Sequence, residues 1–251
     1  MTTVFTEADL THDAFLGGLL QLYQPRKGYR AGADAVLLAA AIPATAGQRV
    51  LELGCGVGTA SLCLAARVPG VQITGVEREP AYAELARRNG GKTFEVVTTD
   101  LADMPLHLRM RQFDHVLANP PFYDRAASVR SRDPMKEAAQ GVHTPLKTWV
   151  KVAAKRLAPK GNAHFVHLME RLPDLLRALP NDLGSVEVLP LAAREGRVPE
   201  RFILRARKNG RGAFCLHPTL ILHEGLMHED DGDSFTPVVR AVLRAGSALR
   251  F

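Results

Sequence analysis

Short apolar runs alternate with stretches of helical length from residue 49 to residue 207. The apolar runs predict seven strands, at residues 49–53, 71–77, 94–98, 113–118, 163–168, 186–189 and 201–207. The stretches between them predict helices at residues 59–67, 81–89, 146–157 and 172–179. Strands that alternate with helices favour a mostly parallel sheet that helices cover on both faces. We therefore predict an α/β fold with a seven-stranded, twisted sheet.

The last two expected strands break this alternation. No helix is predicted between residues 186–189 and residues 201–207. Parallel neighbours need a crossover of about a dozen residues or more, which is usually a helix. We therefore expect these two strands to form an antiparallel hairpin at the edge of the sheet.

The first 48 residues do not follow the alternation either. The only regular element expected there is a helix at residues 33–42. We interpret residues 1–48 as a lead-in that folds over the functional site, and residues 49–251 as a single globular unit.

The chain shows no pattern typical of export or of a membrane span. Its longest apolar run, residues 35–42, is too short to cross a bilayer. The N-terminus carries acidic residues and has no apolar core of a secretory signal. Three cysteines cannot form a disulfide framework, and the absence of a CxxC pair argues against a zinc site. We expect a soluble cytoplasmic protein without a bound metal.

Charge adds one possibility. Lys and Arg number 32 against 26 Asp and Glu, which gives a formal net charge of +6. A basic surface is compatible with a polyanionic partner but does not by itself identify one.

A glycine-rich turn follows the first strand of the alternating region. Gly54, Gly56 and Gly58 alternate with other residues, so the backbone can turn tightly and a ligand can approach it without meeting a Cβ. Thr59 stands where the dinucleotide fingerprint GxGxxG requires a glycine, which argues against a cofactor with a pyrophosphate.

Carboxylates follow the next two strands. Glu77 closes the second strand, where an acid can accept hydrogen bonds from two ribose hydroxyls, and Asp100 follows the third. Ligands of open α/β sheets bind at the carboxyl ends of the strands. Each feature alone could be a tight turn or a solvated acid, but the three in register predict a nucleoside site.

The fourth strand ends in the tetrapeptide Asn119-Pro120-Pro121-Phe122. The prolines fix φ and remove N–H donors, so the loop offers acceptors: the Asn119 side-chain oxygen and the Pro120 carbonyl. Two such acceptors could bind both hydrogens of an exocyclic amino group and free its lone pair, while Phe122 stacks on the base. No general base is needed, since the proton can leave from the methylated nitrogen. The alternative is a Pro-rich turn that caps the strand.

These motifs resemble the class I S-adenosylmethionine-dependent methyltransferases, which have a Rossmann-like fold. The resemblance is carried by residues 52–58, Glu77, Asp100 and the tetrapeptide, which is typical of amino-group methyltransferases. It implies S-adenosyl-L-methionine as the cofactor. The residues it implies at the cofactor are Asp34, Glu52, Gly54, Cys55, Gly56, Gly58, Glu77, Asp100, Leu101 and Asn119. The catalytic residues it implies are Asn119, Pro120, Pro121 and Phe122.

The whole chain resembles the small-domain methyltransferases related to the tRNA(Val) adenine-N6 enzymes. Residues 15–18, 24–38 and 201–208 carry this narrower likeness. Relatives usually have Ser or Thr before the Asp of the lead-in, whereas Ala33 precedes Asp34 here. The resemblance implies methyl transfer to N6 of an adenine in structured RNA, most simply tRNA near the anticodon.

Basic residues support an RNA partner. The residues we expect to bind RNA are Arg125, Arg130, Arg132, Arg201 and Arg205. The alternative is a solvated basic face on the edge hairpin. Two other functions stay open at this point: the same chemistry on a guanine of ribosomal RNA or on a protein glutamine, and a non-catalytic module that binds cofactor or RNA.

Overall fold

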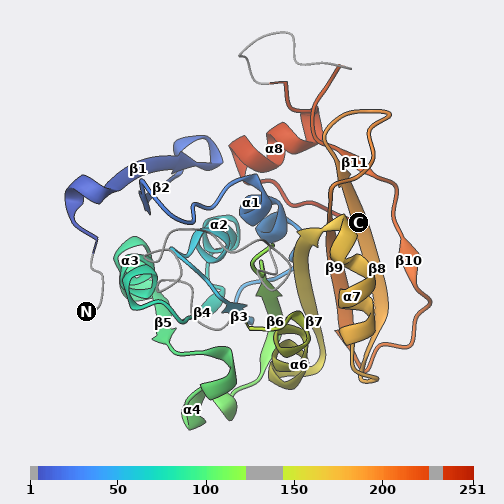
Figure 1. Ribbon diagram of the computed structural model, residues 1–251, viewed down its shortest axis with the longest axis horizontal. Coiled ribbons are helices and arrows are strands. Elements are labelled where there is room, and N and C mark those ends of the chain that lie inside the picture. Colours follow the sequence, from blue (N-terminus) through green and yellow to red (C-terminus); the bar gives the residue numbers. More distant parts are fainter. Residues whose placement is uncertain (1–4, 123–143, 226–233) are drawn as a thin grey trace, which may run out of the picture.

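A computed structural model describes residues 5–122, 144–225 and 234–251 of the 251-residue chain. Its centre is a nine-stranded sheet in the order β10-β8-β9-β7-β6-β3-β4-β5, with β11 also paired to β8 (Figure 1). The strands are β3 (Arg49–Leu53), β4 (Gln72–Glu77), β5 (Phe94–Thr98), β6 (Phe113–Ala118), β7 (Leu157–Leu168), β8 (Leu183–Ala192), β9 (Arg201–Lys208), β10 (Cys215–Leu216) and β11 (Leu220–Ile221). The seven predicted strands are all present, so the prediction of an α/β fold with a mostly parallel sheet is confirmed.

The strand order reverses at the middle of the sheet. β3 pairs in parallel with β4 on one side and with β6 on the other. The chain leaves β3 toward β4 and β5, and then returns to the far side of β3 as β6 and β7. A reversal of this kind opens a crevice at the carboxyl ends of the strands. The glycine turn after β3 and the tetrapeptide after β6 lie on its two sides.

The antiparallel hairpin is present, although it is not the outermost part of the sheet. β9 pairs antiparallel with both β7 and β8. The two short strands β10 and β11 then pair in parallel with β8, which corrects the expectation that the hairpin forms the edge. With two residues each, β10 and β11 are too short to give a periodic pattern in the sequence.

Helices cover both faces of the sheet, as predicted. One buried cluster includes residues of α1 (Ala33–Ala40), α2 (Thr59–Arg67), α3 (Pro80–Gly90) and α8 (Pro237–Ala245). The other includes residues of α4 (Leu106–Arg109), α6 (Leu146–Arg156) and α7 (Leu172–Ala178). Both clusters consist mainly of aliphatic side chains, whose burial is the main force that holds the helices on the sheet.

The lead-in contains a β-hairpin that the sequence did not predict. Its strands, β1 (Leu10–Phe15) and β2 (Leu20–Pro25), pair antiparallel from Leu10 opposite Pro25 to Phe15 opposite Leu20. In Figure 1 the hairpin lies apart from the central sheet, beside α3. The apolar residues of β1, Leu10, Ala14 and Phe15, do not alternate with polar ones, so its sequence gives no strand pattern. The expected lead-in helix is present as α1, which ends at Ala40.

Short 3-10 turns complete the described chain. They are η1 (Glu7–Asp9), η2 (Leu16–Gly18), η3 (Gly91–Thr93), η4 (Leu101–Asp103) and η5 (Met169–Arg171). The most relevant is η4, because Asp100 caps it at the carboxyl end of β5. No described helix is long and apolar enough to cross a membrane.

Candidate active site

The glycine turn between β3 and α2 is shaped by its neighbours as well as by its backbone. Gly54 and Gly58 have φ values of 64° and 88°, in the left-handed region that favours glycine. A Cβ at Gly54 would lie 2.5 Å from the Trp149 ring, and one at Gly58 would lie 2.8 Å from the Phe94 ring. At Gly56 the nearest atom to a Cβ would be in the Tyr29 ring, at 3.5 Å. The rings of Trp149 and Phe94 therefore pack against the turn at Gly54 and Gly58, and the Tyr29 ring covers it at Gly56.

Glu52 lies beneath this turn and not at its surface. It is 3% exposed, and its Oε2 accepts hydrogen bonds from the backbone N–H of Ser61, at 3.0 Å, and from the Ser61 hydroxyl. Burial raises the pKa of the Glu52 carboxyl to about 8, although both Ser61 bonds oppose the shift. Glu52 thus joins the end of β3 to the first turn of α2, which fixes the path of the glycine turn.

Stability should depend on pH through Glu52. The ordinary pKa of the carboxyl is 4.5 and its pKa in the folded chain is about 8, so the folded state holds the proton more tightly. Its contribution is present below about pH 5 and is lost as the pH rises through 8. We expect Glu52→Gln to remove this dependence and to be more stable than the wild type above pH 8, by on the order of 2–4 kcal/mol.

Urea unfolding from pH 5 to pH 9 measures this difference. Glu84→Gln is the matched control, because the Glu84 side chain is 72% exposed on α3. Parallel stability curves for the wild type and Glu52→Gln would contradict the assignment.

Glu77 ends β4 and faces the glycine turn. Its Oε2 accepts from the N–H of Gly56 at 2.8 Å, and its Oε1 accepts from the N–H of Glu79 at 2.9 Å. Burial raises the pKa of Glu77, and these N–H groups oppose the shift. Each carboxylate oxygen can accept two hydrogen bonds. The N–H of Arg78 also donates to this carboxylate, so one of its four acceptor positions remains for a hydroxyl group of a ligand beside Gly56.

The next strand end carries Asp100 and Leu101. The Asp100 Oδ1 accepts from the N–H of Ala102 at 2.8 Å, and Oδ2 lies 3.8 Å from Nη1 of Arg78. The Leu101 side chain is buried in the cluster beneath α6. Cys55 is also buried, and burial raises the pKa of its thiol, so the residue fills space within the turn.

The tetrapeptide lies at the carboxyl end of β6, next to the glycine turn in the strand order. Pro120 is buried and Pro121 is exposed. The Phe122 ring contacts the ring of His167, with 5.4 Å between centroids, and the guanidinium of Arg201 lies 5.8 Å from the Phe122 centroid. A shallow cavity is lined by Pro120, Pro121, Phe122, Thr144, Leu146, Trp149, His167 and Arg171. The loop thus presents its acceptors beside an apolar and aromatic surface.

Tyr29 links the two halves of the site, and sequence reasoning did not single it out. Its hydroxyl accepts a hydrogen bond from Nδ2 of Asn119 at 3.3 Å, while its ring covers Gly56. Desolvation of the hydroxyl, followed by the charges of nearby carboxylates, raises the pKa of Tyr29 to about 12. The contact directs the Asn119 amide nitrogen toward Tyr29 and leaves its oxygen free to accept from a substrate. The signal in the sequence that could have marked Tyr29 is an aromatic residue directly after Gly28 in a polar stretch.

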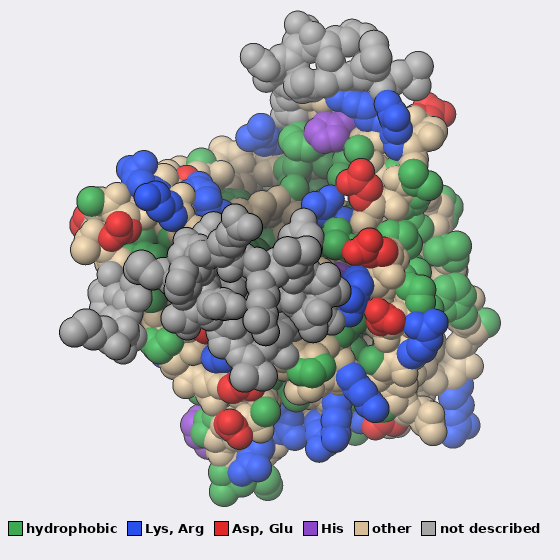
Figure 2. All heavy atoms as spheres, viewed as in Figure 1, with side chains coloured by type: hydrophobic (Ala, Val, Ile, Leu, Met, Phe, Trp, Pro, Cys, Tyr) green, Lys and Arg blue, Asp and Glu red, His purple; other side chains and the backbone are tan. Residues whose placement is uncertain are grey.

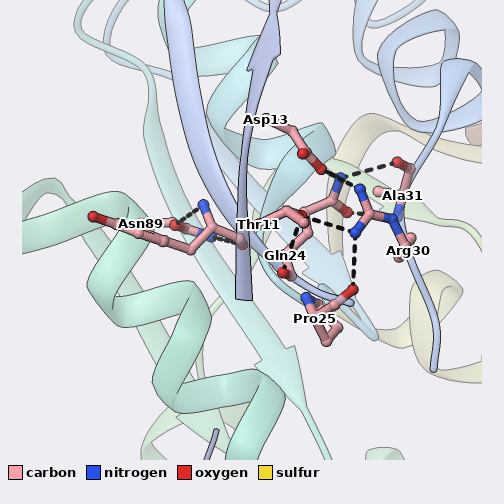
Figure 3. A network of polar contacts seen from close by, with 8 residues as sticks. Thr11, Asp13, Gln24, Pro25, Arg30, Ala31 and Asn89 are labelled. Atoms are coloured by element: carbon pink, nitrogen blue, oxygen red, sulfur yellow. Dashed lines mark hydrogen bonds and ion pairs between the residues drawn. The ribbon is translucent and has the colours of Figure 1, made fainter. Parts of the chain in front are cut away.

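A polar network fixes the segment that carries Tyr29 (Figure 3). The Gln24 side chain donates to Asp13 at 2.7 Å and accepts from the N–H of Ala31 at 2.8 Å, which closes the loop between β2 and α1. Arg30 pairs with Asp13 at 2.5 Å. Separately, Asn89 of α3 exchanges two hydrogen bonds with the backbone of Tyr23, which attaches the hairpin to the main domain. Hydrogen bonds and an ion pair therefore fix the chain both before Tyr29, at Tyr23, and after it, at Arg30 and Ala31.

Asp34 and Arg201, predicted for different roles, form an ion pair with each other. The Arg201 Nε donates to Asp34 Oδ2 at 2.9 Å across 167 positions of sequence. Burial raises the pKa of Asp34, and Arg201 opposes this shift. The pair joins α1 to the start of β9, beside Phe122. The Asp34 carboxylate therefore faces Arg201, and contact between this side chain and the cofactor stays a prediction.

The predicted RNA-binding arginines have different surroundings. Arg205 pairs with Glu187 at 2.7 Å, and its side chain is only 18% exposed, so it is part of the sheet and not of an open basic surface. Arg125, Arg130 and Arg132 lie outside the described residues. Figure 2 shows basic side chains at several places on the face that it draws, with acidic side chains among them. Within the described part of the chain, Arg201 is thus the predicted RNA contact that lies nearest the tetrapeptide.

The arrangement fits a nucleoside cofactor at the crevice. Gly56 beside the Tyr29 ring, the remaining acceptor position of Glu77 and the carboxylate of Asp100 follow three adjacent strands, β3, β4 and β5. Among the described residues, no group of three or more His, Cys, Asp or Glu side chains could hold a metal ion.

The fold and this site define a class I methyltransferase, which uses S-adenosylmethionine as its methyl donor. Residues 31–190 match the methyltransferase small domain family. This chain belongs to that family.

Relatives with assigned activities cover most of the chain. A tRNA1(Val) (adenine(37)-N6)-methyltransferase of Porphyromonas gingivalis is 31% identical over 183 residues, which are 64% of this chain and 69% of the relative. The enzyme of the same name from Haemophilus influenzae is 24% identical over 213 residues, which are 82% of this chain and 86% of the relative.

Solved structures agree in fold. A predicted O-methyltransferase from Agrobacterium tumefaciens has a TM-score of 0.71 at 24% identity, covering 87% of this chain and 99% of that one. A 16S rRNA N2 methyltransferase from T. thermophilus, in complex with AdoMet and guanosine, has a TM-score of 0.55 at 22% identity, covering 79% of this chain and 50% of that one.

Proposed function

We propose that this enzyme transfers a methyl group from S-adenosylmethionine to the N6 amino group of an adenine in structured RNA, most simply a tRNA near its anticodon. The observation that carries the proposal is the position of Asn119 and Pro120. They lie at the end of β6, next to the glycine turn of β3, with the Asn119 amide turned by Tyr29. The tRNA activity in the names of the relatives from P. gingivalis and H. influenzae supports the substrate class.

The residues of the chain would act by holding the amino group. S-adenosylmethionine supplies an electrophilic methyl group when it is bound. The Asn119 oxygen and the Pro120 carbonyl accept the two amino hydrogens, which draws the nitrogen lone pair out of conjugation with the ring. Phe122 stacks on the base, and placement of reacting groups in this way can contribute up to about 7–11 kcal/mol to the barrier reduction. The proton leaves from the nitrogen after it has been methylated.

The lead-in would complete the site on the cofactor side. Tyr29 lies over Gly56, and the hydrogen bond between its N–H and the Tyr82 hydroxyl, at 2.9 Å, places it above α3. We include in the proposal that residues 1–48 form a cover for the cofactor, and that residues 49–251 form the methyltransferase domain. Arg201 and the arginines after Phe122 would contact phosphates of the RNA, since phosphate contacts set affinity and position while the target base leaves its stack.

The direct test is incubation of the purified protein with labelled S-adenosylmethionine and total RNA from cells that lack this enzyme. Nucleoside mass analysis should find new N6-methyladenosine in the tRNA fraction. Methylated guanine in ribosomal RNA, or label in protein glutamine, would keep the chemistry of the tetrapeptide and refute the adenine substrate. Binding of the cofactor without transfer to any RNA or protein would indicate a non-catalytic module.

A further inference from the structure

We propose that His167 selects the target base, by donating a hydrogen bond from its Nε2 to the ring nitrogen beside the amino group that is methylated. The inference deepens the proposed function and rests on it. It makes His167 a specificity residue that touches the substrate, on a strand that carries none of the family motifs.

The fold brings His167 to the tetrapeptide. β7 is the parallel neighbour of β6, and His167 is the second-last residue of β7, so it lies at the same edge of the sheet as Asn119. Its ring contacts Phe122 at 5.4 Å between centroids, with 55° between the ring planes. It also lines the cavity that Pro120, Pro121 and Phe122 form. A base stacked on Phe122 would therefore have His167 near its edge.

The backbone fixes which nitrogen of His167 carries the proton. The N–H of Leu168 donates to Nδ1 of His167 at 2.8 Å, so Nδ1 must be an acceptor. In a neutral imidazole the other nitrogen, Nε2, then carries the hydrogen. Burial, followed by the charge of Arg171, lowers the pKa of His167 to about 4, so the ring is neutral at pH 7. Among the described residues, the hydrogen bond of the His167 ring is the one at Nδ1, and Nε2 does not belong to the fully buried atoms that lack a partner. His167 thus has one fixed donor, on a ring that lines the cavity.

A fixed donor at this place matches adenine. The amino group of adenine lies between N1 and N7, and both ring nitrogens are acceptors. The amino group of guanine is flanked on one side by N1–H, which is a donor. Two donors that face each other cannot pair, and such a mismatch discriminates more strongly than a missing contact. His167 would therefore accept adenine in either orientation and disfavour guanine in one of them.

The experiment combines variants of His167 with altered bases. The RNA is a synthetic anticodon stem-loop in which the adenosine methylated by the wild type is replaced by 1-deazaadenosine or 7-deazaadenosine. We expect one of the two analogues to lower kcat/KM of the wild type about 10-fold. His167→Phe keeps the aromatic contact with Phe122 and removes the donor. It should lose about 10-fold on adenosine and show no further loss on that analogue.

Two further variants test the donor itself. His167→Gln places an N–H near the position of Nε2 and should recover part of the activity on adenosine. His107→Gln and His107→Phe are matched controls, because His107 is exposed on α4. Nitrogen-15 NMR of the histidine rings, with no RNA present, should show His167 as the neutral Nε2–H form from pH 6 to pH 8.

The outcomes separate this inference from the proposed function. Equal sensitivity of the wild type and His167→Phe to both analogues, or an imidazolium or Nδ1–H form at pH 7, overturns the role of His167 while methylation of adenosine still stands. Methylation of guanosine or glutamine in place of adenosine overturns the proposed function, and the role of His167 at adenine with it.

Discussion

Asn119→Ala is expected to lower kcat for methyl transfer by on the order of 10²–10³-fold, the loss that follows removal of one fixed hydrogen-bonding group from a pre-organised catalytic site. The Asn119 oxygen is one of two acceptors for the amino hydrogens, and its orientation comes from the 3.3 Å contact between its Nδ2 and the Tyr29 hydroxyl. Alanine removes the acceptor and leaves the adjacent prolines in place. The affinity for S-adenosylmethionine should fall by about 10-fold at most, the loss of one neutral hydrogen bond, because Glu77 and Gly56 stay intact.

Single-turnover kinetics with saturating RNA and cofactor separate this effect from binding. The matched control is Asn181→Ala, since Asn181 is exposed before β8. Tyr29→Phe gives a graded comparison: it retains the ring over Gly56 and removes only the hydroxyl, so a loss near 10-fold in kcat is expected for one neutral hydrogen bond. If Asn119→Ala kept more than a tenth of the wild-type kcat, the acceptor role of Asn119 would be wrong.

Glu77→Ala is expected to weaken the binding of S-adenosylmethionine by about 100-fold. A hydrogen bond to a charged group contributes about 1.5–3 kcal/mol, and one lost bond to a ribose hydroxyl would therefore account for such a change. The Gly56 N–H, which donates to Glu77 at 2.8 Å, also loses its partner, which loosens the turn under Tyr29. Because the carboxylate acts on binding, kcat at saturating cofactor should fall much less than the affinity.

Isothermal titration with S-adenosylhomocysteine measures this prediction without turnover. Glu79→Ala is the matched control, because it removes the same charge from the same loop while its backbone N–H still donates to Glu77. Amide hydrogen exchange in the same samples tests the lead-in: the ligand should slow exchange of residues 28–34 in the wild type and in Glu79→Ala. Unchanged exchange of this segment on binding would refute the proposal that the lead-in covers the cofactor.

The alternation of strands and helices was readable because it follows from local chemistry. Runs such as residues 49–53 and 113–118 are buried on both faces of a parallel sheet, so their sequences are mainly hydrophobic, with Glu52 and His115 as buried polar exceptions. Glycines that need a positive φ, and prolines that remove donors, mark Gly54, Gly58 and Pro120 without reference to distant residues. The motifs at the ends of β3 and β6 are therefore properties of the sequence itself.

Weakly patterned elements could not be read in this way. The lead-in hairpin has few buried positions of its own, and it is held by side chains such as Gln24 and Asn89 that bond across the chain. β10 and β11 have two residues each and exist because β8 offers them a free edge. Their stability comes from contacts that no local window of sequence contains.

The functional site also combines features that local sequence determines with features that depend on distant contacts. By itself the sequence determined the chemistry: a glycine turn, carboxylates at successive strand ends, and a loop of acceptors for an amino group. Only the tertiary structure decided the partners. The fold pairs Arg201 with Asp34 and Arg205 with Glu187. It also brings Tyr29 into contact with Asn119. It places His167 beside Phe122, and the backbone there fixes which nitrogen of His167 is the donor. The physical reason is that backbone conformation depends on neighbours in sequence, whereas hydrogen bonds and ion pairs between side chains depend on which strands the fold makes adjacent.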